Sequence, residues 1–70
     1  MTIELKVPTI SCQHCVNAIT SEVSQLQGVQ RVAVDLGSKQ VSVEADERVT
    51  TAAVIGAINE AGYDDVSVLN

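Results

Sequence analysis

Two cysteines stand three residues apart near the beginning of the chain, in the stretch Cys12-Gln13-His14-Cys15. They follow a segment with strand alternation and precede one with helical spacing, so both sulfurs are expected at the start of a helix. Residues three apart lie on the same side of a helix, and the partial positive charge of its N-terminus favours thiolate over thiol. Two thiolates that converge in an exposed loop form a chelating pair for a soft cation.

The number of available ligands indicates which cation the two cysteines would bind. A structural zinc site takes four ligands, usually Cys and His. The chain has two cysteines, one histidine and Met1, and the side chain of His14, between the cysteines, is expected to point away from both sulfurs. Cu(I) is soft and is satisfied by two thiolates in near-linear geometry. Cys12 and Cys15 are therefore the predicted ligands of Cu(I), and Ag(I) and Hg(II) fit the same pair.

Two other uses of this motif stay open at this point. A thiol-disulfide oxidoreductase also places a CxxC pair at a helix N-terminus, although this chain lacks the aromatic before the first cysteine and the downstream proline of the thioredoxin type. His14 is either exposed and unused or a ligand across a copper-bridged homodimer, in which its reach improves. A structural disulfide is not expected, because glutathione keeps cytosolic thiols reduced.

Composition excludes several classes of function. The net charge is −5 and the four cationic side chains are scattered, which argues against nucleic-acid binding. Tyr63 is the sole aromatic residue, so base stacking has no platform. No segment approaches the ~20 apolar residues of a membrane helix, and residues 1–10 lack the features of a secretory signal. We expect a cytoplasmic protein that is not an enzyme, since no catalytic constellation is visible.

The elements that must position the cysteines can be predicted from periodicity. Alternation of apolar and polar residues predicts strands, and the Gly37-Ser38 connection predicts a β-hairpin; the strand segments are residues 3–7, 32–36, 41–45 and 66–69. Apolar residues at helical spacing predict two helices with inner faces made of Val16, Ile19, Val23 and Leu26, and of Val54, Ala57, Ile58 and Ala61.

The helix ends carry their own signals. Ser11 is the expected N-cap of the first helix and Thr50 that of the second. Gly28 and Gly62 are expected to end them in the C′ position. The resulting order, β-α-β-β-α-β, predicts an α+β fold of the ferredoxin-like type: one open-faced sandwich over residues 1–70, with two helices on one face of an antiparallel sheet.

The stretch Thr9-Ile10-Ser11-Cys12-Gln13-His14-Cys15, the element order and the late Ala61-Gly62-Tyr63 together resemble the heavy-metal-associated domain family, over essentially the whole chain. Within that family the chain is similar to the bacterial cytosolic copper chaperones. The resemblance implies that Cys12 and Cys15 are the metal ligands and that Tyr63 lies in the neighbouring loop, where it shields the site from water.

The resemblance also implies a function. The chain would bind Cu(I) and transfer it by ligand exchange to a copper-transporting P-type ATPase, whose own domains carry matching CxxC loops. Alternatives within the family are an excised metal-binding domain of such an ATPase and a mercury carrier. The sequence departs from the family at Ile10, where Met is usual, and at Pro8-Thr9, near the usual Gly. Met to Ile nearly conserves volume in a core position, whereas Pro restricts the loop.

Overall fold

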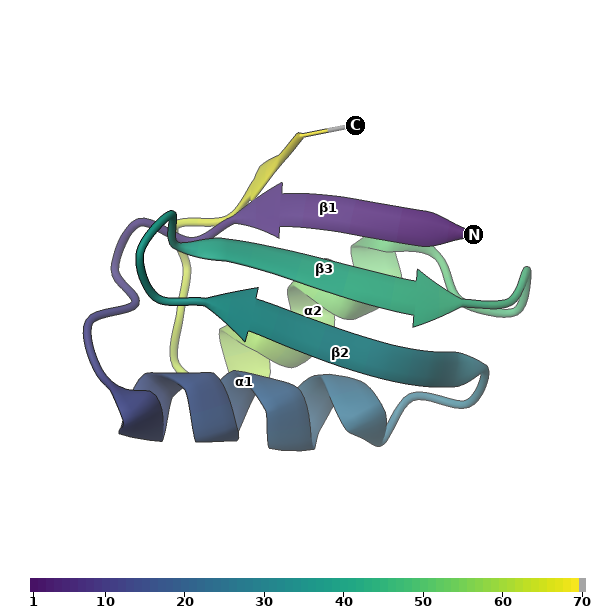
Figure 1. Ribbon diagram of the computed structural model, residues 1–70. Coiled ribbons are helices and arrows are strands. Elements are labelled where there is room, and N and C mark those ends of the chain that lie inside the picture. Colours follow the sequence, from purple (N-terminus) through teal and green to yellow (C-terminus); the bar gives the residue numbers. More distant parts are fainter. Residues whose placement is uncertain (70) are drawn as a thin grey trace.

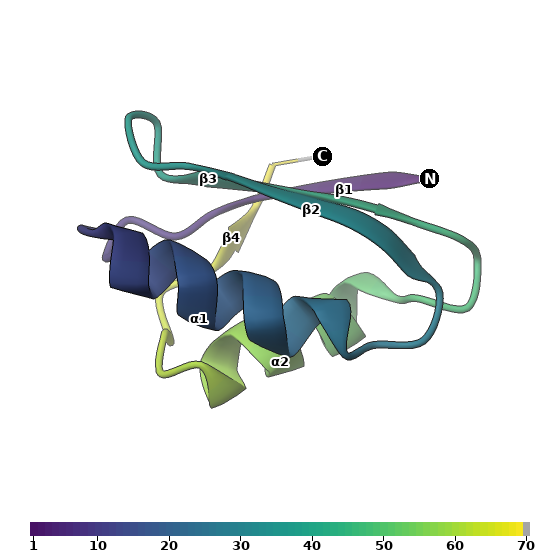
Figure 2. The ribbon, with the colours of Figure 1, turned by 60° about the horizontal axis from the view of Figure 1, so that its bottom comes forward.

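The computed structural model describes residues 1–69. It forms a four-stranded antiparallel sheet in the order β2-β3-β1-β4, with both helices on one face (Figures 1 and 2). This β-α-β-β-α-β arrangement is the predicted α+β fold class, which is confirmed. The elements are β1 (Thr2–Lys6), α1 (Gln13–Ser24), β2 (Val29–Asp35), β3 (Gln40–Ala45), α2 (Thr51–Glu60) and β4 (Ser67–Val68).

Alternation along β1, β2 and β3 places one apolar row of each of these strands under the helices. Ile3 pairs with Val43 and Leu5 pairs with Val41, and all four side chains are buried. Ile19 and Val23 of α1, with Val54, Ala57 and Ile58 of α2, complete the core from the helix layer. Among the described residues, no polar or charged side chain is buried. Because the fully buried residues of this core make the fold and Cys15 packs only against its edge, the protein is expected to fold without metal.

Each predicted strand is wrong by one to three residues at an end: β1 is Thr2–Lys6 rather than 3–7, β2 begins at Val29 rather than residue 32, and β3 begins at Gln40 rather than residue 41. The second strand ends at Asp35, so Leu36 lies in the β2–β3 turn and is exposed. The last strand has only the two residues Ser67 and Val68, because it pairs with β1 through Leu5 and Lys6 alone. The N-cap of α1 is Cys12 rather than Ser11, and its consequence for the site is given below.

Gly28 does not end α1 in the C′ position as expected. The helix stops at Ser24 with Gln25 as its C-cap, and a short turn separates that end from Gly28. Gly28 nevertheless has a left-handed backbone, with φ of 100°. The other capping predictions are confirmed, since the Thr50 hydroxyl accepts a hydrogen bond from Ala53 N at 3.1 Å and Gly62 follows the C-cap of α2 with φ of 102°.

Replacing Gly28 should destabilise the fold at the end of the molecule away from the cysteines. A Cβ at Gly28 would lie 2.4 Å from Asp46 Oδ1, and the Asp46 carboxylate is held by the Arg48 side chain at 2.8 Å. Together with the left-handed backbone, this contact should make Gly28→Ala cost about 1–3 kcal/mol in the free energy of unfolding. Chemical denaturation measures it.

Gly56→Ala is the matched control for this substitution. Gly56 lies on the exposed side of α2, and an added Cβ there meets nothing within 4 Å. Alanine in a helix is favoured over glycine by about 0.5–1 kcal/mol, so this variant should be slightly more stable than the wild type. Equal effects of the two substitutions would contradict the assignment of strain to Gly28.

Candidate metal-binding site

The loop from Val7 to Cys12 connects β1 to α1 and presents the cysteines at one end of the molecule. The β2–β3 turn and the segment after α2 reach the same end (Figure 1). Ile10 N donates to Val7 O at 3.1 Å, which closes a turn within the loop. The Ile10 side chain is fully buried in the core. Ile10, which stands where the resemblance expects Met, therefore anchors the loop to the core.

Cys12 forms the N-cap of α1 by its backbone alone. Its carbonyl oxygen accepts hydrogen bonds from Cys15 N at 3.1 Å and Val16 N at 3.3 Å, while its own backbone is extended and its side chain caps no backbone N–H. Ser11 was the expected cap because a hydroxyl satisfies a free helix N–H. The helix begins one residue later, and the Cys12 side chain is left free for the neighbouring sulfur.

The two sulfurs lie together, as the spacing of the cysteines predicted. Cys12 Sγ and Cys15 Sγ are 3.5 Å apart. Both cysteines are free thiols, with Cys12 exposed and Cys15 half-buried. Within residues 1–69, no group of three or more His, Cys, Asp and Glu side chains comes together as a metal site. The arrangement therefore offers a soft ion two sulfurs, one of which is open to solvent.

The environment of Cys15 favours its thiolate. A hydrogen bond from the Tyr63 hydroxyl, followed by bonds from the Ser11 backbone and the Cys12 thiol, lowers the pKa of Cys15 to about 6. Cys15 is thus largely ionised at neutral pH, which is the state that binds metal and acts as a nucleophile. The loop therefore carries one of its two sulfurs already deprotonated.

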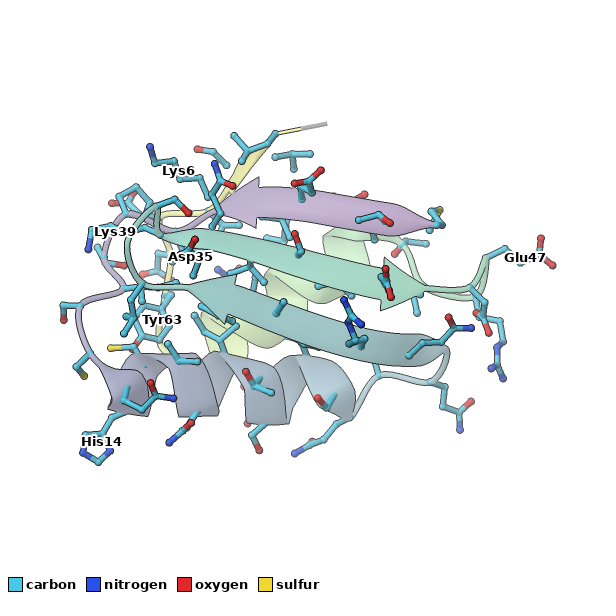
Figure 3. All side chains as sticks on the ribbon, in the orientation of Figure 1. Lys6, His14, Asp35, Lys39, Glu47 and Tyr63 are labelled. Carbon is cyan, nitrogen blue, oxygen red and sulfur yellow. The ribbon has the colours of Figure 1, made fainter. Side chains whose placement is uncertain are left out.

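Tyr63 stands beside the cysteines, where the resemblance implied it would be. It follows Gly62 after α2, is half-buried against the core, and lies at the same end of the molecule as the loop that carries the cysteines (Figure 3). Its carbonyl oxygen accepts a hydrogen bond from Asn59 Nδ2 at 2.6 Å, which ties this segment to the helix. Its hydrogen bond with Cys15 raises the pKa of Tyr63 to about 12, so the hydroxyl keeps its proton and can donate to the thiolate.

His14 and Lys39 complete this end of the molecule. His14 is exposed at the first turn of α1 and its ring points outward (Figure 3), in agreement with its expected orientation. Lys39 was not predicted as part of the site. It lies in the β2–β3 turn, 29 residues from Ile10 in sequence, and its Nζ donates to Ile10 O at 2.5 Å. The sequence carries no signal for this contact beyond the position of the turn itself.

Tyr63→Phe should raise the pKa of Cys15 from about 6 toward its ordinary value of 9.0, because the ring remains but the hydroxyl is lost. The folded protein binds fewer protons than the unfolded chain between these two values. Stability of the metal-free wild type should therefore rise from pH 6 to pH 9 and fall as pH drops through the folded pKa. The variant should show a smaller rise. Ultraviolet absorbance of the thiolate and denaturation at several pH values measure the two effects.

Cys15→Ser serves as the control, since it should abolish both the low-pH absorbance step and its share of the pH-dependent stability. A Tyr63→Phe protein that titrates like the wild type would refute the hydroxyl as the main cause.

Comparisons with known proteins agree with a metal-binding role for the cysteine loop. The heavy-metal-associated domain matches residues 4–64. The copper chaperone CopZ of Bacillus subtilis is 41% identical over 61 residues, 86% of this chain and 88% of CopZ. A copper-exporting P-type ATPase of Mycobacterium tuberculosis is 34% identical over 61 residues, 87% of this chain but 8% of the ATPase.

A solved structure agrees with the fold. A yeast copper transporter domain, determined in apo and Cu(I)-loaded states, has a TM-score of 0.91 and 26% identity, and the match covers 99% of this chain and 94% of that domain. No helix among residues 1–69 has the length and apolar character needed to cross a bilayer. Since the family match spans most of its length and the fold is the same, the chain belongs to the heavy-metal-associated domain family.

Proposed function

We propose that this protein carries one Cu(I) ion between Cys12 and Cys15 and delivers it to a copper-transporting P-type ATPase. The observation that carries the proposal is the pair of free sulfurs 3.5 Å apart at an exposed loop, with the pKa of Cys15 lowered to about 6. The role is that of a carrier rather than an enzyme. Its proposed compartment is the cytoplasm, where glutathione keeps such thiols reduced.

Cu(I) suits a site with two sulfurs, beside which residues 1–69 place no third Cys, His, Asp or Glu ligand. A linear bridge with metal–sulfur bonds of about 2.3 Å, the length of a zinc–thiolate bond, holds its sulfurs about 4.6 Å apart. The observed separation is 3.5 Å, so one sulfur must move outward by about 1 Å when the ion enters. Cys12 is exposed, whereas Cys15 is half-buried and hydrogen-bonded to Tyr63, so we expect the Cys12 sulfur to make this movement. Ag(I) and Hg(II) fit the same pair, and the copper relatives favour Cu(I).

The proposed partner carries a domain of the same kind. The match to the copper-exporting ATPase of Mycobacterium tuberculosis occupies 8% of that protein, as expected for one small domain attached to a much larger transporter. Donor and acceptor would then present the same pair of thiolates, so the ion passes between sites of similar affinity. A chain that was itself such a domain of an ATPase would bind Cu(I) in the same way and act as the acceptor.

The test is designed to separate this proposal from thiol-disulfide exchange. The reduced protein is titrated with Cu(I) against a competing chelator, and the product is weighed by native mass spectrometry. One Cu(I) per protomer is expected, together with no catalytic turnover in the reduction of a disulfide-bonded reporter. Turnover of the reporter without stoichiometric Cu(I) uptake would replace the carrier by an oxidoreductase.

His14 has a proposed role only between two copies of the protein. It is exposed beside the cysteines and points away from its own loop (Figure 3). In a dimer whose two cysteine loops face each other and share copper, His14 could therefore contact the second protomer. His14→Ala should leave the Cu(I) affinity of the monomer within about tenfold, or roughly 1.4 kcal/mol. Dimerisation in the presence of copper should weaken, which sedimentation velocity would detect. Identical dimerisation of both proteins would remove this role.

A further inference from the structure

Lys39 has a backbone conformation that ordinarily favours glycine. Its φ is 60°, and it is the one non-glycine residue with a positive φ in residues 1–69. Residues other than glycine are disfavoured in this left-handed region, because their Cβ atom is crowded by the backbone. The neighbouring Gly37 in the same turn does not adopt it. A lysine therefore occupies the strained position of this turn, and the contacts of its side chain must offset that strain.

The contacts of Lys39 hold both ends of the turn that precedes the cysteines. Its carbonyl oxygen accepts a hydrogen bond from Val7 N at 2.9 Å, and its Nζ donates to Ile10 O at 2.5 Å. Val7 and Ile10 are themselves joined by the hydrogen bond from Ile10 N to Val7 O at 3.1 Å. Both of their side chains are fully buried. The lysine thus contacts the two residues that fix where the loop leaves the core.

The ammonium bond reaches the part of the loop nearest to the metal-binding pair. Ile10 is two residues before Cys12, and Cys12 is the exposed ligand whose position the helix does not fix by a side-chain cap. Lys39 is half-buried, and Figure 3 shows it at the loop end of the sheet. A charged donor on a carbonyl makes a stronger hydrogen bond than a neutral one. The side chain thereby restricts the segment that carries Cys12.

We propose that Lys39 is a positioning residue for metal binding, which holds the Val7–Ile10 turn so that Cys12 stays close to Cys15. The proposal rests on the proposed function. Backbone strain at Lys39 is then offset by a hydrogen bond that glycine could not make. The loop is then held by its own Ile10 side chain, which is buried in the core, and by Lys39, which bonds to Ile10 through its ammonium and to Val7 through its carbonyl.

Three substitutions distinguish the effect of Lys39 on the order of the loop from its effect on the stability of the whole fold. Lys39→Met keeps a long side chain without a donor, Lys39→Arg keeps a cationic donor, and Lys39→Gly removes the side chain but relieves the left-handed backbone. Backbone amide relaxation of the metal-free protein should show greater mobility at residues 10–12 in the Met and Gly variants. Lys39→Arg should restore the order of these amides.

Copper affinity and thermal stability should then diverge. Lys39→Gly should unfold at a higher temperature than Lys39→Met, because only glycine removes the strain, yet both should bind Cu(I) about three- to tenfold more weakly than the wild type. Lys39→Arg should bind within about twofold of the wild type. A positioning role predicts this split, whereas a purely structural role makes affinity follow stability.

Lys6→Met is the matched control, since it removes the same charge from an exposed lysine at the end of β1. If it reproduces the Lys39→Met phenotype, net charge rather than the loop contact is responsible and the proposal fails. It also fails if residues 10–12 are equally ordered in Lys39→Met, or if they loosen with Cu(I) affinity unchanged. Absence of Cu(I) binding by the wild type would refute the proposed function. The amide relaxation of the metal-free protein would still test whether the contact of Lys39 with Ile10 orders the loop.

Discussion

Cys15→Ser and Cys12→Ser should each lower the affinity for Cu(I) by about a thousandfold or more, because a serine hydroxyl is a hard ligand and leaves one thiolate to hold a soft ion. The two losses should differ. Cys15 enters the complex already ionised, with its pKa lowered to about 6 by Tyr63 and the loop. We expect Cys15→Ser to be the more damaging substitution at neutral pH, as measured by competition with a chelator of known Cu(I) affinity.

The pH dependence gives a second measure of the same asymmetry. Below pH 6 the proton competes with Cu(I) for Cys15, so affinity should fall by about tenfold per pH unit for each proton displaced. The Ser11→Ala protein is the matched control, because its side chain is lost beside the site while both sulfurs and the backbone donor stay. Tight, stoichiometric Cu(I) binding by a Cys12→Ser/Cys15→Ser double variant would show that the ion is held elsewhere.

Transfer of Cu(I) to an acceptor domain with its own CxxC loop should be much faster than spontaneous loss of the ion. The incoming thiolate forms a third bond to the two-coordinate metal, and one original metal–sulfur bond then breaks. Cys12 is the exposed cysteine of the pair, so its sulfur should be the first to release the ion. The barrier stays low at each step without weakening the resting complex. Stopped-flow mixing should therefore give a rate that rises with acceptor concentration.

The control for this experiment is an acceptor in which both cysteines are replaced by serine. It should leave the rate at the level of loss to a non-contacting trap. The protein has a net charge of −5, so transfer to a partner with a basic surface should slow as salt screens the encounter. A rate that equals spontaneous loss and ignores the acceptor concentration would mean that the metal dissociates first, and direct exchange would have to be abandoned.

Most of the fold could be predicted from the sequence because the sheet is open to water on one face. Strict alternation in β1 and β3 then marks which side chains are buried, as with Leu5 and Val41. The errors fall where hydrogen bonding rather than hydrophobic pattern sets a boundary. Gly28 was read as a helix end from residue type, but its left-handed backbone serves a turn that packs against Asp46.

The site was predictable to the extent that it is local. The spacing of Cys12 and Cys15 places both sulfurs at one helix N-terminus, and the separation of 3.5 Å agrees with that expectation. Tyr63 could be placed only through the resemblance to a family, because its approach to Cys15 depends on how α2 packs. The contact of Lys39 with Ile10 spans 29 residues and joins a turn to a loop. No local pattern encodes such a contact.

The separation of the cysteine loop from the apolar core has a consequence for protein engineering. Residues 11–14 are exposed, Cys15 is half-buried and packs against the core, and Ile10 and Ile19 are the fully buried residues on either side. The exposed residues Ser11, Gln13 and His14 can therefore be exchanged while the buried core keeps its contribution to stability. Libraries that vary the residues around the two sulfurs should yield carriers with altered metal preference, and nearly all of their members should fold.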